Sequence, residues 1–161
     1  MTREALEGFP GTVPMRNAEG TRLYERVPGA YAAKEPLDRA RIRIRTELGE
    51  GWILCDGSPS EDVEAASIAP LYRLESGPPS VLTGRVFIVA RSCESLESAL
   101  KDVAPLGFRV DHRPRSAPAG AWLAPIGERR SQALTAIGDL HGLEALEIIQ
   151  PEAITERQER G

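Results

Sequence analysis

Hydrophobic and polar residues alternate most regularly in residues 39–46, Arg-Ala-Arg-Ile-Arg-Ile-Arg-Thr. Because successive side chains of a strand point to opposite faces, this period of two predicts a strand with one charged face and one mostly apolar face. The apolar run 52–55, Trp-Ile-Leu-Cys, predicts a second strand, and the glycine-rich turn before it indicates a hairpin. Residues 21–27 and 30–34 predict two further short strands, which Pro28-Gly29 separates.

A period of about 3.6 residues enters the pattern after Ser92. Apolar residues at i, i+3, i+4 and i+7, from Leu96 to Val103, mark one face of a helix, and Ser92 or Ser95 is a suitable N-cap. A second apolar stripe runs from Ala133 to Leu140, and Gly142 is a natural stop. The predicted elements after residue 84 are strand 85–90, helix 95–103, strand 108–112, strand 120–124, helix 128–140 and strand 145–149.

This order of strand, helix, strand, strand, helix and strand is the split-βαβ or ferredoxin-like order. The sequence therefore predicts an α+β fold in which a ferredoxin-like βαββαβ antiparallel sheet carries both helices on one face and follows a small β-rich unit. The expected core of the sheet and helices consists of Val86, Ile88, Leu96, Leu100, Val103, Leu134, Ile137 and Ile148.

The strongest boundary in the chain is Glu75-Ser-Gly-Pro-Pro-Ser80, because Gly-Pro-Pro does not fit inside a regular element. It divides the chain into an irregular lead-in, a small β-rich unit, a linker and the α+β domain. The predicted bounds are 1–21, 22–76, 77–84 and 85–158, and we expect residues 82–158 to fold alone.

The composition excludes some classes of function but does not identify the function. The chain has 161 residues, of which 41% are hydrophobic and 27% charged, as in a soluble globular protein. A net charge of −4 gives no general attraction to nucleic acid or acidic membranes. The N-terminal residues lack the apolar core of a secretory signal, and no apolar run is long enough to span a membrane, so the chain as given is expected to be cytoplasmic.

The charged face of the strand in residues 39–46 is a candidate basic surface, formed by Arg39, Arg41, Arg43 and Arg45. Such a row suits phosphates or an acidic partner, but it is equally typical of a half-exposed strand protected by charge. Because aromatic residues do not interleave with it and acidic residues flank it, we do not expect nucleic-acid binding.

Catalytic chemistry has little support in the sequence. Cys93 precedes a helix, a position that lowers a thiol pKa, but nothing in the spacing brings His112 or His141 to it. Cys55 lies in an apolar strand and is expected in the core. Two cysteines and two histidines in separate segments do not predict a metal site, and no nucleotide-binding or nucleophile-elbow motif occurs. We expect a non-enzymatic protein without cofactor or metal.

Trp122 is the candidate interface residue, because tryptophan is enriched at binding hot spots. The alternative is that it fills the edge of the core, which is the more common role of such a residue.

Three segments of the second half carry a family resemblance: the strand Arg-Val-Phe-Ile-Val-Ala of 85–90, the apolar Gly-Ala-Trp-Leu-Ala of 120–124 and the closing strand 146–152. Together with the helix that ends at Gly107, they resemble the propeptide domain of subtilisin-like serine proteases over about residues 84–158. Gln150 and Pro151 depart from that pattern, because acidic residues are common there.

The resemblance implies a folding chaperone and inhibitor of a subtilisin-like protease, acting on its own precursor or on a separate chain. It also implies that the sheet packs on two helices of the protease and that an extended C-terminal tail occupies the active-site cleft, where main-chain hydrogen bonds supply affinity. The residues of this tail are Ala153, Ile154, Thr155, Glu156, Arg157 and Gln158. The alternative is a ferredoxin-like regulatory or small-ligand-binding domain that forms a homodimer through its sheet.

Overall fold

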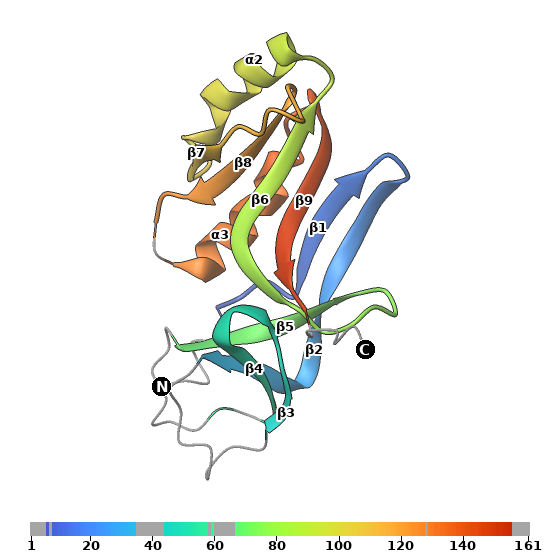
Figure 1. Ribbon diagram of the computed structural model, residues 1–161, viewed down its shortest axis with the longest axis vertical. Coiled ribbons are helices and arrows are strands. Elements are labelled where there is room, and N and C mark those ends of the chain that lie inside the picture. The colour runs from blue at the N-terminus through green and yellow to red at the C-terminus, as the bar shows by residue number, and fades with distance from the viewer. Residues whose placement is uncertain are drawn as a thin grey trace. The chain divides into compact units, whose positions relative to one another are not determined.

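The computed structural model describes Leu6, residues 8–34, 44–57, Pro59, 67–127 and 129–155, with residues 44–46 described by their backbone only. The strands and helices are drawn in Figure 1. The strands are β1 Thr12–Asn17, β2 Gly20–Lys34, β3 Ile44–Glu47, β4 Trp52–Asp56, β5 Ile68–Leu74, β6 Val81–Ala90, β7 Phe108–His112, β8 Gly120–Pro125 and β9 Leu146–Ile154; the helices are α2 Cys93–Val103 and α3 Arg130–Leu140.

The chain divides into two compact units, each built from separated segments. Unit 1 consists of Met1–Thr12, Tyr24–Leu82 and Ala153–Gly161, and unit 2 consists of Val13–Leu23 and Thr83–Glu152. Strands β1, β2, β6 and β9 therefore each contribute residues to both units.

The strands of unit 2 lie in the order β1-β9-β6-β8-β7. The β6–β8 and β8–β7 pairs are antiparallel, and so is β1–β9, in which Arg16 lies opposite Ile149. In Figure 1, α3 lies behind β6 and β8. The apolar stripe of α3 is buried, from Ala133 to Leu140, as is that of α2, so both helices contribute to the core.

The helix boundaries follow from local chemistry. The side-chain oxygen of Ser92 accepts a hydrogen bond from the Ser95 backbone N–H at 3.1 Å, which caps α2. After α2, Gly107 takes a positive φ of 99°, a conformation that glycine adopts readily. α3 begins at Arg130 without a side-chain cap, two residues later than predicted.

In unit 1, β2 pairs with both β4 and β5, and β3 pairs with β4, all antiparallel. Two apolar clusters form its core. One consists of Ala32, Leu48, Trp52, Leu54, Ala69, Leu71, Val81 and Ile154, and the other of Leu6, Tyr31, Ala33, Ile53, Cys55 and Ile68. Cys55 is thus a core residue, as predicted, and burial raises the pKa of its thiol.

The predicted fold class is wrong. The described chain is mostly antiparallel sheet, with nine strands and two helices, and its strands pair in one order, β3-β4-β2-β1-β9-β6-β8-β7, with β5 beside β2. It is not a ferredoxin-like βαββαβ sheet that follows a separate β-rich unit. One cause is β1, which was expected to be part of an irregular lead-in and instead pairs with β9.

A second cause is β2, which is one strand of 15 residues instead of two short ones. The pairing of β2 with β5 shifts register between Arg26 and Tyr31, so this irregularity accommodates Pro28 and Gly29, the latter with φ of 74°. The expected linker 77–84 also overlaps β6, whose first residues, Val81 and Leu82, are buried.

Most of the predicted core is confirmed, with two exceptions. Val86, Ile88, Leu96, Val103, Leu134 and Ile137 are buried. Leu100 is half-buried at the margin of the α2 stripe. Ile148 is also half-buried, because its neighbour Ile149 is the residue of β9 that points into the core, where it is fully buried.

Candidate functional site

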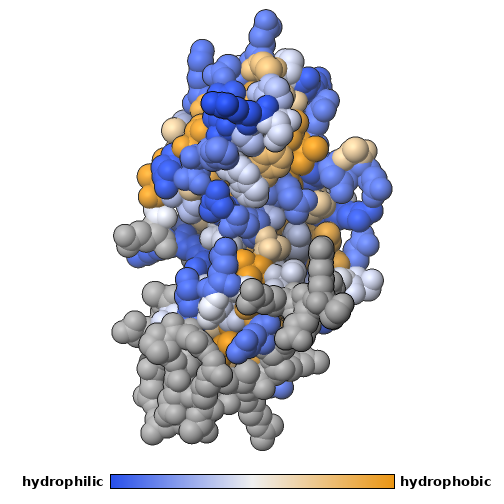
Figure 2. Space-filling view, viewed as in Figure 1, coloured by the Kyte–Doolittle hydropathy of each residue, from blue (hydrophilic) through white to orange (hydrophobic). Residues whose placement is uncertain are grey.

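The alternation along β6 distinguishes the two faces of the unit 2 sheet. Within residues 83–90 the even positions are buried and the odd positions are half-buried. A Cβ atom built on Gly84 would lie 3.2 Å from the Cβ of Ala133, so the even positions face α3. The odd positions lie on the opposite side. Figure 2, in the same view as Figure 1, shows hydrophobic and hydrophilic residues intermixed over the coloured part of the surface.

We call this second side the open face. The residues that define it are Thr83, Arg85, Phe87 and Val89 of β6, Gly120 and Trp122 of β8, Asp111 of β7 and Glu152 of β9.

The centre of the open face is an aromatic pair. Phe87 and Trp122 lie opposite each other in the β6–β8 register, with ring centroids 5.1 Å apart and ring planes at 41°. Gly120 leaves room for this arrangement, because a Cβ atom there would lie 2.9 Å from Cζ of Phe87. The glycine on the neighbouring strand therefore supplies the space that the phenyl ring of Phe87 occupies.

Arg85 extends over this pair and links three strands. Its guanidinium carbon lies 4.8 Å from the centroid of the Trp122 ring, a cation–π geometry. The same guanidinium donates to Oε2 of Glu152 at 2.6 Å and to Oδ2 of Asp111 at 2.8 Å. Thr83 donates to the other oxygen of Glu152 at 3.0 Å. Arg85 is thereby held across β8, between acceptors on β9 and β7.

The electrostatics of the open face follow from this network. The hydrogen bond from Arg85 holds the pKa of Asp111 below its ordinary value, and Arg109, whose Nη1 lies 3.3 Å from Oδ1 of Asp111, acts in the same direction. Two arginines thus face two carboxylates. The open face presents an apolar centre with a rim of paired, opposite charges, which is the usual anatomy of a protein interface.

The cysteines and histidines of the described residues lie in separate elements. Cys93 is exposed at the start of α2, His112 is exposed in β7, and His141 follows α3. Among the described residues, no three His, Cys, Asp or Glu side chains are grouped as metal ligands. Burial lowers the pKa of His141, and its Nε2 is buried without a hydrogen-bond partner among the described residues.

The other predicted site residues fall in different places. Trp122 lies on the open face, half-buried beside Phe87, and its role at an interface stays a prediction. Arg39, Arg41 and Arg43 lie outside the described residues, and Arg45 is described only by its backbone in β3. The arginine row therefore stays a prediction.

The first two residues of the predicted tail lie in β9. Ala153 and Ile154 are the last residues of β9, and Ile154 belongs to the apolar core of unit 1. Thr155 is exposed, whereas Glu156, Arg157 and Gln158 lie outside the described residues. An extended tail free from residue 153 is therefore excluded in this conformation, because burying Ile154 fixes it in the fold.

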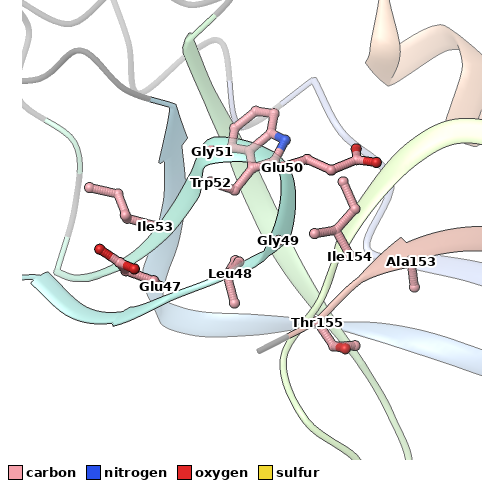
Figure 3. A pocket seen from close by; sticks show the side chains of 10 residues that line it. All are labelled: Glu47, Leu48, Gly49, Glu50, Gly51, Trp52, Ile53, Ala153, Ile154 and Thr155. Carbon is pink, nitrogen blue, oxygen red and sulfur yellow. The ribbon is translucent and has the colours of Figure 1, made fainter. Parts of the chain in front are cut away.

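Unit 1 carries a pocket of about 630 Å³ at this end of β9. Its lining consists of residues 47–53 and 153–155, as Figure 3 shows. The segment 49–51 forms a tight turn in which Glu50 and Gly51 have positive φ of 58° and 83°. The Gly49 N–H donates to the Thr155 carbonyl at 3.3 Å, so the turn is bonded to the end of β9.

Sequence reasoning missed most of the open face. The alternation of β6 could have indicated Phe87 and Val89, because it separates their side from that of Val86 and Ile88. Nothing local relates Arg85 to Glu152, which is 67 residues away.

Comparisons with known proteins give this site no precedent: no protein-family model, no curated protein and no solved structure matches the chain. Within the described residues, no helix combines the length and the apolar character that crossing a membrane requires.

Proposed function

We propose that this protein is a non-enzymatic protein-binding module whose contact surface is the open face of unit 2. The observation that carries the proposal is the fixed cluster of Phe87, Trp122 and Arg85 on a sheet face that α3 does not cover. Tryptophan and arginine are the residues most enriched at binding hot spots. Side chains already held in place lose little conformational entropy on binding, which favours affinity.

The geometry favours a partner surface that is helical and mostly apolar. Five strands spaced about 4.8 Å apart span roughly 19 Å, which accommodates two helices packed about 10 Å apart. The paired rim charges give no net sign to the face, so contact depends on shape and apolar burial more than on long-range attraction.

The proposed partner class is a subtilisin-like serine protease, which the protein would inhibit and help to fold. This choice rests on the sequence resemblance of 85–90, 120–124 and 146–152 to the propeptides of such proteases. An open sheet face that suits two helices agrees with the mode of binding that this resemblance implies.

The test is titration of a subtilisin-like protease, followed by peptide hydrolysis and by complex formation in gel filtration. Val89→Glu places a charge in the apolar part of the open face and should weaken binding at least about 10-fold. Ser98→Glu makes the same charge change on the exposed side of α2 and should leave binding unchanged. Arg109→Glu, on a side chain that is 59% exposed, tests the rim without risk to the core.

The outcomes separate the parts of the proposal. A protein that neither slows hydrolysis nor forms a complex at micromolar concentration would exclude the protease as partner. Equal losses for Val89→Glu and Ser98→Glu would exclude the open face. Unfolding midpoints of the three variants, measured first, show whether a loss comes from misfolding.

A second candidate is self-association through the same face. The observation that favours it is the balance of Arg85 and Arg109 against Asp111 and Glu152, because a two-fold axis can bring opposite charges of two copies together. Light scattering of the isolated protein tests it, and a monomer at high micromolar concentration would exclude it.

A further inference from the structure

The end of β9 is held by unit 1 through side-chain packing. Ile154 is only 9% exposed and packs in the cluster that contains Leu48, Trp52 and Leu71. The residues that follow the open face along β9 are therefore anchored in an apolar core.

The turn before β4 adds a close main-chain contact. The Leu48 N–H donates to the Trp52 carbonyl at 2.7 Å, which closes the turn, and the Gly49 N–H donates to the Thr155 carbonyl at 3.3 Å. A Cβ atom on Gly49 would lie 3.3 Å from Cγ2 of Ile154, so the turn touches the isoleucine directly. Figure 3 shows Leu48 and Ile154 on facing sides of the pocket.

We propose that residues 48–52 form a latch that holds Ile154 and Thr155 and thereby keeps the C-terminal segment from its partner. This inference rests on the proposed function and on the sequence resemblance behind it, which implies that the same segment lies extended in a protease cleft. A residue buried in the core of unit 1 cannot at the same time lie in that cleft, so the two states compete.

The competition between the latched and the released state determines how strongly the latch reduces the apparent affinity for the protease. The apparent affinity of a protein whose binding-competent state is rarely populated is reduced by the fraction in that state. Exposing one buried isoleucine and breaking one hydrogen bond makes the open state roughly 30- to 1,000-fold less populated than the closed state. Intact protein is therefore a weaker inhibitor than a protein with a loosened latch.

Gly49→Val tests the latch from the side of the turn, because its side chain pushes against Ile154 and leaves the C-terminal segment unchanged. Gly49 is outside the left-handed region, so the backbone accepts a side chain there. Gly49→Ala makes a smaller intrusion and should give a smaller effect. Gly11→Val is the matched control, since no atom lies within 4 Å of a Cβ at that position of unit 1.

The readouts are the inhibition constant for a subtilisin-like protease and amide hydrogen exchange at residue 49, whose N–H donates to the Thr155 carbonyl. We expect Gly49→Val to accelerate exchange there and to tighten inhibition about 10-fold or more, with Gly49→Ala between it and the native protein. Faster exchange with an unchanged inhibition constant would overturn the latch and leave the proposed function standing. Absence of binding by every variant would overturn both.

Discussion

The two faces of the unit 2 sheet hold their side chains by different forces. On the covered face, Val86 and Ile88 are fully buried. On the open face, Arg85 and Phe87 stay half-exposed and are fixed by ion pairs, a cation–π contact and a glycine that leaves space for a ring. One strand thus contributes stability with its even positions and, in the proposed function, a preorganised contact surface with its odd positions. Substitutions should therefore separate stability from binding.

The largest expected effect is on the covered face. Ile137→Ala should lower the free energy of unfolding by about 2–5 kcal/mol, because Ile137 is fully buried and the surrounding core relaxes only partly into the cavity. Leu100→Ala should cost about 1–2 kcal/mol, since Leu100 is half-buried. Urea unfolding of both variants measures the difference, and equal losses would contradict the assignment of Leu100 to the margin.

A medium effect is expected from closing the space on the open face. Gly120→Ala places a methyl group 2.9 Å from Cζ of Phe87, and the forced shift should destabilise unit 2 by about 1–3 kcal/mol. Trp122 fluorescence should change in the same variant because its neighbouring ring moves. Gly138→Ala is the control: position 138 has open space within α3, so that variant should gain up to about 1 kcal/mol. If Gly120→Ala changes neither the stability nor the Trp122 fluorescence, Phe87 is not held in place.

The smallest effect concerns pH and His141. Burial lowers the pKa of His141, Arg16 lowers it further, and a hydrogen bond with the Pro14 backbone opposes both. The unfolded state, with a pKa near 6.5, therefore takes up a proton before the folded state does, so stability falls as pH drops below about 6.5.

Thermal unfolding between pH 8 and pH 5 checks this direction. His141→Gln should flatten the profile, whereas His112→Gln, on an exposed residue of β7, should leave the histidine-dependent decline in place. A decline that survives in His141→Gln would assign it to another group.

Sequence periodicity was sufficient for the local elements and insufficient for their assembly. The stripe from Leu96 to Val103 predicted α2, and the apolar run 85–90 predicted the greater part of β6, because both patterns are complete within a few residues. The pairing of β9 with β1 could not be predicted, since the two strands lie far apart in the sequence. In addition, β1 contains Pro14 and follows Pro10 and Gly11, which are typical of turns. Choosing Ile148 in place of Ile149 is the same error at one residue, because only the neighbouring strands define the register.

The candidate site shows the same limit. Trp122 was singled out by residue type alone, whereas its surroundings depend on contacts among β6, β7 and β9. Arg85 contacts Asp111 and Glu152 only after the sheet has formed. The alternation along a strand predicts the face on which a charged side chain lies, but it does not predict the partner of that side chain. The burial of Ile154 could not be predicted either, because a single apolar residue in polar surroundings carries no periodic pattern.

The pairing of β1 with β9 has a consequence for how the chain folds while it is being synthesised. The guanidinium of Arg16 bonds to the Leu146 carbonyl, 130 residues later in the chain. During synthesis, β1 emerges early and can pair with β2, which follows it directly, but its other edge has no partner until β9 has been made. We therefore expect unit 2 to close late and slowly, because long-range strand pairing is slow and leaves edges exposed to other chains meanwhile. A nascent chain stalled before residue 146 should stay sensitive to protease at β1, and one extended past residue 155 should become resistant.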